Sequence, residues 1–176
     1  MKHVFITSAV FTTVVLIAGC GDQKQSGVAP QSGPQTVAAP KPVQEKFESV
    51  TVKLSSPAYG GVDGINDVIT PKAGSTVTIK GDKITIAGNY VDAIKGEAAV
   101  GVVAIIGGKP YVAIYGGERP DIAKTLNNPK YLKSQFYIEV PTATVGAGLH
   151  DLKMRVISAD KSGYYESDLI AKLDVK

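Results

Sequence analysis

The chain of 176 residues contains no tryptophan, a single cysteine and only two histidines. Because the one cysteine is Cys20, the sequence excludes an intramolecular disulfide and a metal site built from several thiolates. His3 lies near the N-terminus, which leaves His150 as the one histidine in the rest of the chain. The lack of tryptophan argues against a carbohydrate platform, although eight tyrosines keep that function open.

The chain also lacks a large excess of either positive or negative charge. The chain has 19 Lys and Arg residues against 16 Asp and Glu residues. Removing an N-terminal signal, as argued below, would take away Lys2 and bring the balance closer to neutral. A nearly neutral chain without a basic stripe indicates neither nucleic-acid binding nor strong electrostatic docking on anionic lipid.

The one long apolar run lies at the N-terminus. Lys2 and His3 precede it, and residues 4–18 are mostly apolar. The run is shorter than the roughly 20 residues that span a ~30 Å hydrocarbon core, so it is typical of an export signal. It ends in Leu16-Ile17-Ala18-Gly19-Cys20, which resembles the lipobox of bacterial lipoproteins. The alternative is a buried or disulfide-bonding Cys20 in a cleaved or uncleaved helix.

The lipobox resemblance implies cleavage before Cys20 and acylation of the new N-terminus. Two or three acyl chains, at about 0.8 kcal/mol for each buried methylene, hold a protein on a membrane nearly permanently. The expected location is therefore the bacterial cell envelope, with the membrane as a partner through Cys20. Gly21 stands where an aspartate would favour inner-membrane retention, so the outer membrane is favoured if the source is diderm.

Three regions follow from these patterns: a signal peptide over residues 1–19, a lipidated linker over 20–47 and a single domain over 48–176. The linker is rich in Gln, Ser, Gly, Ala and Pro and has no aromatic residue before Phe47. It lacks the apolar surface that would offset the entropy of ordering, which predicts a disordered tether. A coil of this length spans roughly 30 Å.

Alternating apolar and polar residues dominate the domain. Val50, Val52 and Leu54, for example, alternate with Thr51 and Lys53, as in a half-buried strand. Similar runs, together with continuous Val- and Ile-rich runs, predict about eight strands within residues 50–54, 76–80, 84–86, 98–106, 111–115, 136–140, 150–156 and 168–175.

Two turn signals predict hairpins. Gly81-Asp82 separates residues 76–80 from 84–86, as in a two-residue hairpin. Gly107-Gly108 separates 98–106 from 111–115, which predicts a second hairpin that is central in its sheet.

Residues 118–126 break the alternation. Pro120 suits a first helical turn, Asp121 complements the positive helix start, and the run 127–129 (Asn-Asn-Pro) is a stop signal. We therefore expect one short helix that crosses between two sheets. The expected fold is all-β: an antiparallel, immunoglobulin-like β-sandwich of about eight strands with one short connecting helix.

A series of short motifs spans residues 76–175. In order they are Gly88-Asn89-Tyr90-Val91-Asp92, Gly108-Lys109-Pro110-Tyr111, Tyr115 to Asp121, Phe136, Gly148-Leu149-His150 and Val156 to Asp160. Together they resemble an uncharacterised β-sandwich module of bacterial envelope proteins, including extracytoplasmic tails of membrane enzymes that handle surface polysaccharides. The resemblance implies a fold and a compartment, and no activity.

Reactive groups are sparse, and each candidate has a structural alternative. His150 lies on the apolar face of a predicted strand and is typical of a structural histidine near a turn, although Asp151 or Asp160 could complete a triad with a serine. Asp63-Gly64-Ile65-Asn66-Asp67 offers oxygens for calcium but lacks EF-hand spacing, so an Asx-rich turn is favoured. Glycosidase carboxylates could come from Glu97, Glu118, Asp121 or Glu139, but nothing in their spacing singles out two that would face one another.

The strongest candidate binding patch combines Tyr115, Arg119 and Asp121 with Tyr164 and Tyr165. Arginine recognises carboxylate or phosphate and stacks on sugars, and tyrosine offers a flat face with a polar tip. The structural alternative is an Arg119–Asp121 pair that braces the helix start while the tyrosines cover a sheet edge.

Two functional hypotheses follow. The favoured one is a membrane-anchored, non-catalytic envelope lipoprotein that binds a protein or a glycan, with no metal and no cofactor. The alternative is a small hydrolase that acts on envelope polymers through His150 or a carboxylate. The first is favoured because few reactive groups converge in the sequence.

Overall fold

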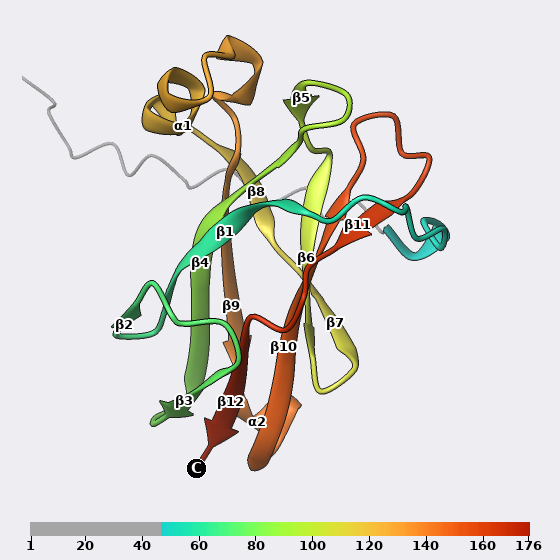
Figure 1. The fold of residues 1–176 in the computed structure, drawn as a ribbon. Helices are drawn as coiled ribbons and strands as arrows, with labels where there is room; N and C mark the ends of the chain where they lie inside the picture. The colour runs from blue at the N-terminus through green and yellow to red at the C-terminus, as the bar shows by residue number, and fades with distance from the viewer. Residues whose placement is uncertain (1–46) are drawn as a thin grey trace, which may run out of the picture. The chain divides into compact units, whose positions relative to one another are not determined.

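The computed structural model describes residues 47–176, and these lie within one compact unit. The lipobox, Cys20 and all but the last residue of the expected linker lie outside the described residues. Four short helical elements occur in the described part: η1 (Phe47–Ser49), α1 (Pro120–Thr125), η2 (Pro129–Tyr131) and α2 (Thr142–Val145). Figure 1 shows α1 and α2 at opposite ends of the molecule.

Two sheets form the body of the fold. The β4 sheet has the strand order β2-β1-β4-β9-β8, with β5 added on β4. Its strands are β1 (Tyr59–Ile65), β2 (Val68–Ile69), β4 (Lys83–Asp92), β5 (Glu97–Ala98), β8 (Ile114–Gly117) and β9 (Gln135–Pro141).

The β10 sheet has the order β3-β12-β10-β6-β7, with β11 added on β10. Its strands are β3 (Ser75–Ile79), β6 (Gly101–Ile106), β7 (Lys109–Val112), β10 (Gly148–Ile157), β11 (Tyr164–Glu166) and β12 (Ala171–Val175). All pairs are antiparallel except β3 with β12.

The expected all-β, immunoglobulin-like sandwich is confirmed. The order β1-β4-β9-β8 matches strands A, B, E and D of the immunoglobulin fold, and β12-β10-β6-β7 matches G, F, C and C′. The described residues contain twelve strands rather than about eight, because β1, β2 and β11 were not expected and the strands expected over 98–106 and 111–115 are each divided in two.

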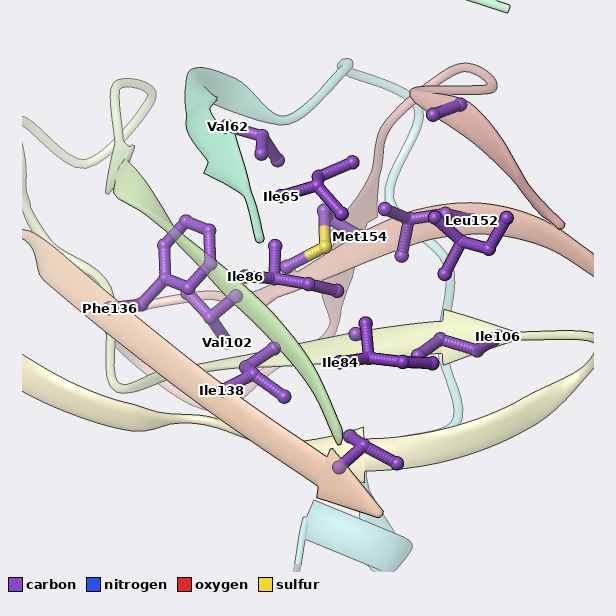
Figure 2. Close-up of a cluster of buried hydrophobic side chains, with 14 of the residues drawn as sticks. Val62, Ile65, Ile84, Ile86, Val102, Ile106, Phe136, Ile138, Leu152 and Met154 are labelled. Carbon is purple, nitrogen blue, oxygen red and sulfur yellow. The ribbon is translucent and has the colours of Figure 1, made fainter. Parts of the chain in front are cut away.

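The core lies between the inner faces of the two sheets. On β4 the alternation places Ile84 and Ile86 inward, and on β10 it does the same for Leu152 and Met154; all four are fully buried. Figure 2 shows these side chains meeting between the sheets, together with Ile138 of β9. Each fully buried side chain of this size contributes about 1.5–3 kcal/mol relative to an exposed one.

The predicted hairpin at Gly107-Gly108 is confirmed. Ile106 pairs with Lys109, so the two glycines are the whole turn, and both have positive φ (56° and 84°) as a type I′ turn requires. Strand β6 lies between β10 and β7 and is internal in its sheet as expected, but β7 lies at the edge, so the hairpin as a whole is not central.

The predicted hairpin at Gly81-Asp82 is wrong. Strand β3 before it belongs to the β10 sheet and β4 after it belongs to the β4 sheet, so the segment crosses between sheets. The Asp82 carbonyl accepts a hydrogen bond from the Thr142 backbone N–H at 2.8 Å instead of closing a local turn. A Gly-Asp pair indicates a change of direction but does not select the partner strand.

Two further expectations about the chain path are corrected. The single strand expected over 111–115 is two strands in different sheets, and the chain changes sheet at Ala113. The helix expected over 118–126 is present as α1, but β8 and β9 on its two sides pair with each other. It therefore connects neighbouring strands of one sheet rather than crossing between sheets.

The strand expected over 50–54 is absent except for one parallel bridge between Lys53 and Tyr164. Residues 47–54, which we call the strap, instead pass along β11 and lie against the outer face of the β10 sheet. Figure 1 shows this cyan segment beside β11 before it crosses to β1. Strand β1 itself was missed, because its glycines weaken the strand signal and the expected Asx-rich turn overlaps its end.

A buried carboxylate joins two loops and strand β11 at the α1 end of the sandwich. Asp92 has no exposed surface, and it accepts hydrogen bonds from the backbone N–H groups of Lys95 (3.0 Å) and Ala159 (2.9 Å). It also accepts one from the Tyr165 hydroxyl at 2.9 Å. Burial and this contact raise the pKa of Tyr165 to about 12. The network ties the end of β4 to β11 and to the loop after β10.

We expect Asp92→Ala to lower the free energy of unfolding by about 3 kcal/mol, because it leaves several buried donors without acceptors. Urea denaturation measures the effect. Asp151→Ala is the matched control, since Asp151 is exposed and pairs only with Lys172 at 3.1 Å, so its effect should stay within about 0.5 kcal/mol. Similar losses in the two variants would contradict the role given to Asp92.

Candidate functional site

A row of exposed apolar side chains crosses the outer face of the β4 sheet. Ile69 pairs with Gly64, Gly64 with Ala87, Ala87 with Tyr137, and Tyr137 with Ile114. Because paired residues point to the same face, these five positions form a line across β2, β1, β4, β9 and β8. We call it the apolar row. Ile69 is 85% exposed, Ile114 55% and Tyr137 38%.

Hydrogen bonds hold Tyr137, in the middle of the sheet, in a fixed position. Its hydroxyl donates to Glu139 Oε2 at 3.0 Å, and Lys83 Nζ donates to the same oxygen at 3.2 Å. The Lys83 contact is the largest cause of the lowered pKa of Glu139. Partial burial, followed by the Glu139 contact, raises the pKa of Tyr137. The hydrogen bond to Glu139 thereby orients the Tyr137 ring.

An ion cluster around Arg119 borders the apolar row. The guanidinium donates to both carboxylate oxygens of Asp121, with Nε–Oδ1 at 2.9 Å and Nη2–Oδ2 at 2.8 Å, and Nη1 donates to Asp63 Oδ2 at 2.6 Å. Asp63 lies at the β-bulge of β1, next to Gly64 of the row. Since β4 and β9 separate β1 from β8, this contact joins the two sides of the sheet.

The Arg119 cluster changes the acidity of its members. The hydrogen bond from Arg119 lowers the pKa of Asp121 to about 2. The same hydrogen bond is the first cause of the raised pKa of Arg119. Bidentate pairing to Asp121 and the single contact to Asp63 occupy the three guanidinium nitrogens, so the arginine fork is engaged within the protein.

The five residues of the predicted patch do not form one surface. Tyr115 donates from its hydroxyl to the Tyr90 carbonyl at 2.6 Å and accepts from the Ala99 N–H at 3.1 Å, and burial raises its pKa. Tyr164 and Tyr165 are buried in β11, which belongs to the other sheet.

The first part of the structural alternative, the Arg119–Asp121 brace, is observed, whereas Tyr164 and Tyr165 are buried strand residues rather than a cover over a sheet edge. Arg119 and Asp121 form the pair that braces the start of α1. Tyr164 lies under the guanidinium of Arg155, with the carbon 4.6 Å from the ring centroid. The part of the patch that remains at a surface is therefore the Arg119 cluster.

The structure does not assemble a triad around His150. Its Nε2 lies 3.0 Å from the Gly146 carbonyl oxygen, so this nitrogen acts as a hydrogen-bond donor to the backbone. Ser158 donates to Asp160 at 2.9 Å, but these residues follow the other end of β10. Seven strand residues at ~3.4 Å place that end roughly 24 Å from His150. Asp151, the other candidate, points to the opposite face and pairs with Lys172.

The four candidate glycosidase carboxylates are each paired with a cation of their own. The pairs are Glu97–Lys130, Glu118–Lys133, Asp121–Arg119 and Glu139–Lys83. All four are exposed, and among residues 47–176 no hydrogen bond or ion pair brings two of them together around a common point. They are surface ion pairs rather than the facing carboxylates of a hydrolase.

The motif considered for calcium is part of the sheet. Ile65 points into the core, and Asp63 pairs with Arg119. Asn66 lies in the turn between β1 and β2. Its side chain crosses to β4, where it accepts from the Thr85 N–H at 2.7 Å and donates to the Lys83 carbonyl at 3.1 Å, instead of closing the turn locally. Within the described residues no group of three or more metal-ligating side chains comes together.

Comparison with known proteins adds no further assignment, since the chain matches no family model and no curated protein. No helix within residues 47–176 is long and apolar enough to cross a membrane. The case for a function therefore depends on the geometry of the surface, and the apolar row with the Arg119 cluster is its most distinctive feature. Sequence patterns along single strands missed the row because it exists only across strands.

We expect Arg119→Met to raise the pKa of Asp121 from about 2 toward the ordinary value of an aspartate. The folded state holds this carboxyl at a lowered pKa, so the interaction stabilises the protein above about pH 4 and is lost as the pH falls toward 2. The melting temperatures of the wild type and the variant should therefore converge over that window. NMR titration of the Asp121 carboxyl carbon measures the shift directly, and an ordinary pKa in the wild type would contradict the assignment.

Proposed function

We propose that this protein is a lipid-anchored, non-catalytic module of the bacterial cell envelope that binds a protein or glycan partner. The anchor is the acylated sulfur of Cys20, on the outer membrane if the source is diderm. The binding surface is the apolar row with the Arg119 cluster beside it. The observation that supports this proposal most is the apolar row, which leaves three large side chains exposed in register across the β4 sheet.

The two outer faces of the sandwich differ in a way that supports this choice. The strap lies against the β10 sheet, where Phe47 and Val50 pack on Val103, Ile157 and Tyr164. On the β4 sheet the row has no such cover from the described residues, since Ile69 and Ile114 remain more than half exposed. An aligned set of exposed apolar side chains with a polar border is typical of an interaction surface.

The near-neutral charge of the face favours recognition by shape and apolar contact. Lys83 pairs with Glu139 on one side of Tyr137, and Arg119 pairs with two aspartates on the other. Because these charges are paired within the protein, they affect the orientation and the specificity of a bound partner more than they attract it over a distance. A partner that covers Tyr137 and Ile114 would gain mainly from burying them.

We expect Cys20→Ser to move the protein from the membrane fraction to the soluble fraction without changing its melting temperature, because the acyl chains depend on that one sulfur. Fractionation of cells followed by immunoblotting measures the distribution. Ser26→Ala is the control and should stay with the membranes. A serine variant that remains fully membrane-bound would overturn the anchor.

We expect Ile114→Lys to weaken partner capture by about tenfold or more, because it replaces an exposed apolar contact with a charge. A photo-crosslinking residue at position 69, on the same row, reports capture in intact cells. Thr78→Lys is the matched control, since Thr78 is exposed on β3 of the other sheet and receives the same new side chain. Both variants should melt within a few degrees of the wild type.

The nature of the adduct at position 69 distinguishes the two partner classes. Adducts that proteases shorten indicate a protein, and adducts that resist proteases but yield to glycan-cleaving enzymes indicate a glycan. Equal adduct yields in the Ile114→Lys and Thr78→Lys variants would remove the apolar row as the binding surface.

A further inference from the structure

The strap packs closely against the outer face of the β10 sheet, in the space left by Gly101 and Gly163, which we call the groove. The Tyr164 N–H donates to the Val52 carbonyl at 2.9 Å, and the Leu54 N–H donates to the Tyr164 carbonyl at 2.8 Å. The strap thus extends the sheet beside β11 as a parallel segment. Lys53 adds an ion pair with Glu166 at 2.9 Å.

Two glycines make room for this segment. A Cβ on Gly101 would lie 2.5 Å from ring carbons of Phe47. A Cβ on Gly163 would lie 2.6 Å from the Val52 carbonyl oxygen and 2.8 Å from Leu54 Cγ. Neither glycine has a positive φ, so the close approach of the strap, rather than backbone conformation, accounts for the absence of a side chain.

The strap packs largely outside the main core. Phe47 and Val50 contact a separate small cluster of Val103, Ile157 and Tyr164, whereas the main core lies between the two sheets. Leu54 is the strap residue that also touches the main core. Removing the strap from its groove would therefore leave the packing between the sheets almost intact, and such a local opening costs less than global unfolding.

A short connection links the strap to the sandwich. Residues 55–58 (Ser-Ser-Pro-Ala) belong to no strand or helix, and Ser55 and Pro57 are exposed. Four extended residues reach up to roughly 14 Å, which allows the strap to leave its own groove and lie beside a neighbouring molecule. Elements joined by such connections exchange between identical chains at low cost, because the interactions broken within one molecule form again with the other.

We propose that the strap exchanges between two copies of this chain, so that the strap of one copy occupies the Gly101 and Gly163 groove of the other. The partner is a second copy because this groove is complementary to a sequence that every copy has. The exchange is two-fold symmetric, with the same interactions made twice. If the proposed lipid anchor holds, confinement to a membrane raises the yield of the exchanged dimer.

Chemical crosslinking between two variants, each with one introduced cysteine, tests the exchange. The proposed anchor acylates the Cys20 sulfur in the membrane-bound chains, and Cys20 is replaced by serine in the soluble ones. Full chains bearing Lys53→Cys or Glu166→Cys, with different affinity tags, are co-expressed and treated with a short bismaleimide. Neither chain can be bridged within itself, so a heterodimer requires the strap of one chain in the groove of the other. Lys172→Cys with Asp151→Cys is the matched control, because this ion pair of 3.1 Å joins β12 to β10 and does not involve the strap.

We expect at least about tenfold more heterodimer from the Lys53 and Glu166 pair than from the control pair. Adding Gly163→Val to the Glu166→Cys chain should abolish the product, since the new side chain would collide with the incoming strap. Gly101→Val is a second blocking variant, and circular dichroism shows that each remains folded. Equal yields from both cysteine pairs, or no heterodimer at all, would overturn the exchange.

The same experiment on Cys20→Ser chains at matched concentration separates the two proposals. Heterodimer that forms in the soluble chains but increases in the membrane-bound ones supports both the exchange and the anchor. Equal yields in the two forms support the exchange and contradict the contribution of the anchor. Absence of the product in both forms overturns the exchange, whatever the fractionation of Cys20→Ser shows.

Discussion

The register between β4 and β9 is the constraint on which the rest of the structure depends. Ile86 pairs with Ile138 on the inner face and Ala87 pairs with Tyr137 on the outer face. Because side chains alternate along a strand, a slip of one residue would expose the isoleucines and bury the tyrosine with its Glu139 contact. Burial of the core and exposure of the apolar row therefore both result from the pairing of β4 with β9. Each buried isoleucine makes a slipped register less stable and so also fixes which side chains are exposed.

How far the sequence predicts this molecule depends on whether a feature is local. Phe136 and Ile138 alternate with polar neighbours, so their strand and its inner face were predictable from β9 alone. The Gly107-Gly108 hairpin was predictable because both glycines adopt the positive φ that the turn needs. Gly81-Asp82 gave the same signal with a different outcome, because its carbonyl bonds to Thr142, which is distant in the sequence.

The errors in the predicted patch have the same origin. Tyr165 is polar enough for a surface, but Asp92, 73 positions away, supplies a buried acceptor for its hydroxyl. The Tyr115 hydroxyl likewise donates to the Tyr90 carbonyl inside the molecule. The Arg119–Asp121 pair was predictable because the two residues are two positions apart in the sequence, whereas the link of Arg119 to Asp63 needed the tertiary fold. A row across strands needs the register of every pair, which single-strand patterns do not contain.

The size of the apolar row limits how a single copy could act. Its three large exposed side chains, at about 1.5–3 kcal/mol each when buried, would barely offset the roughly 4–15 kcal/mol that association costs. One copy would thus hold its partner weakly and release it quickly. Two copies joined by exchanged straps would present two rows to the same partner, and the second contact would form at a high effective concentration without any new side chain. If both proposals hold, the strap bound at Gly101 and Gly163 of the β10 sheet determines how tightly the apolar rows on the β4 sheet bind their partner.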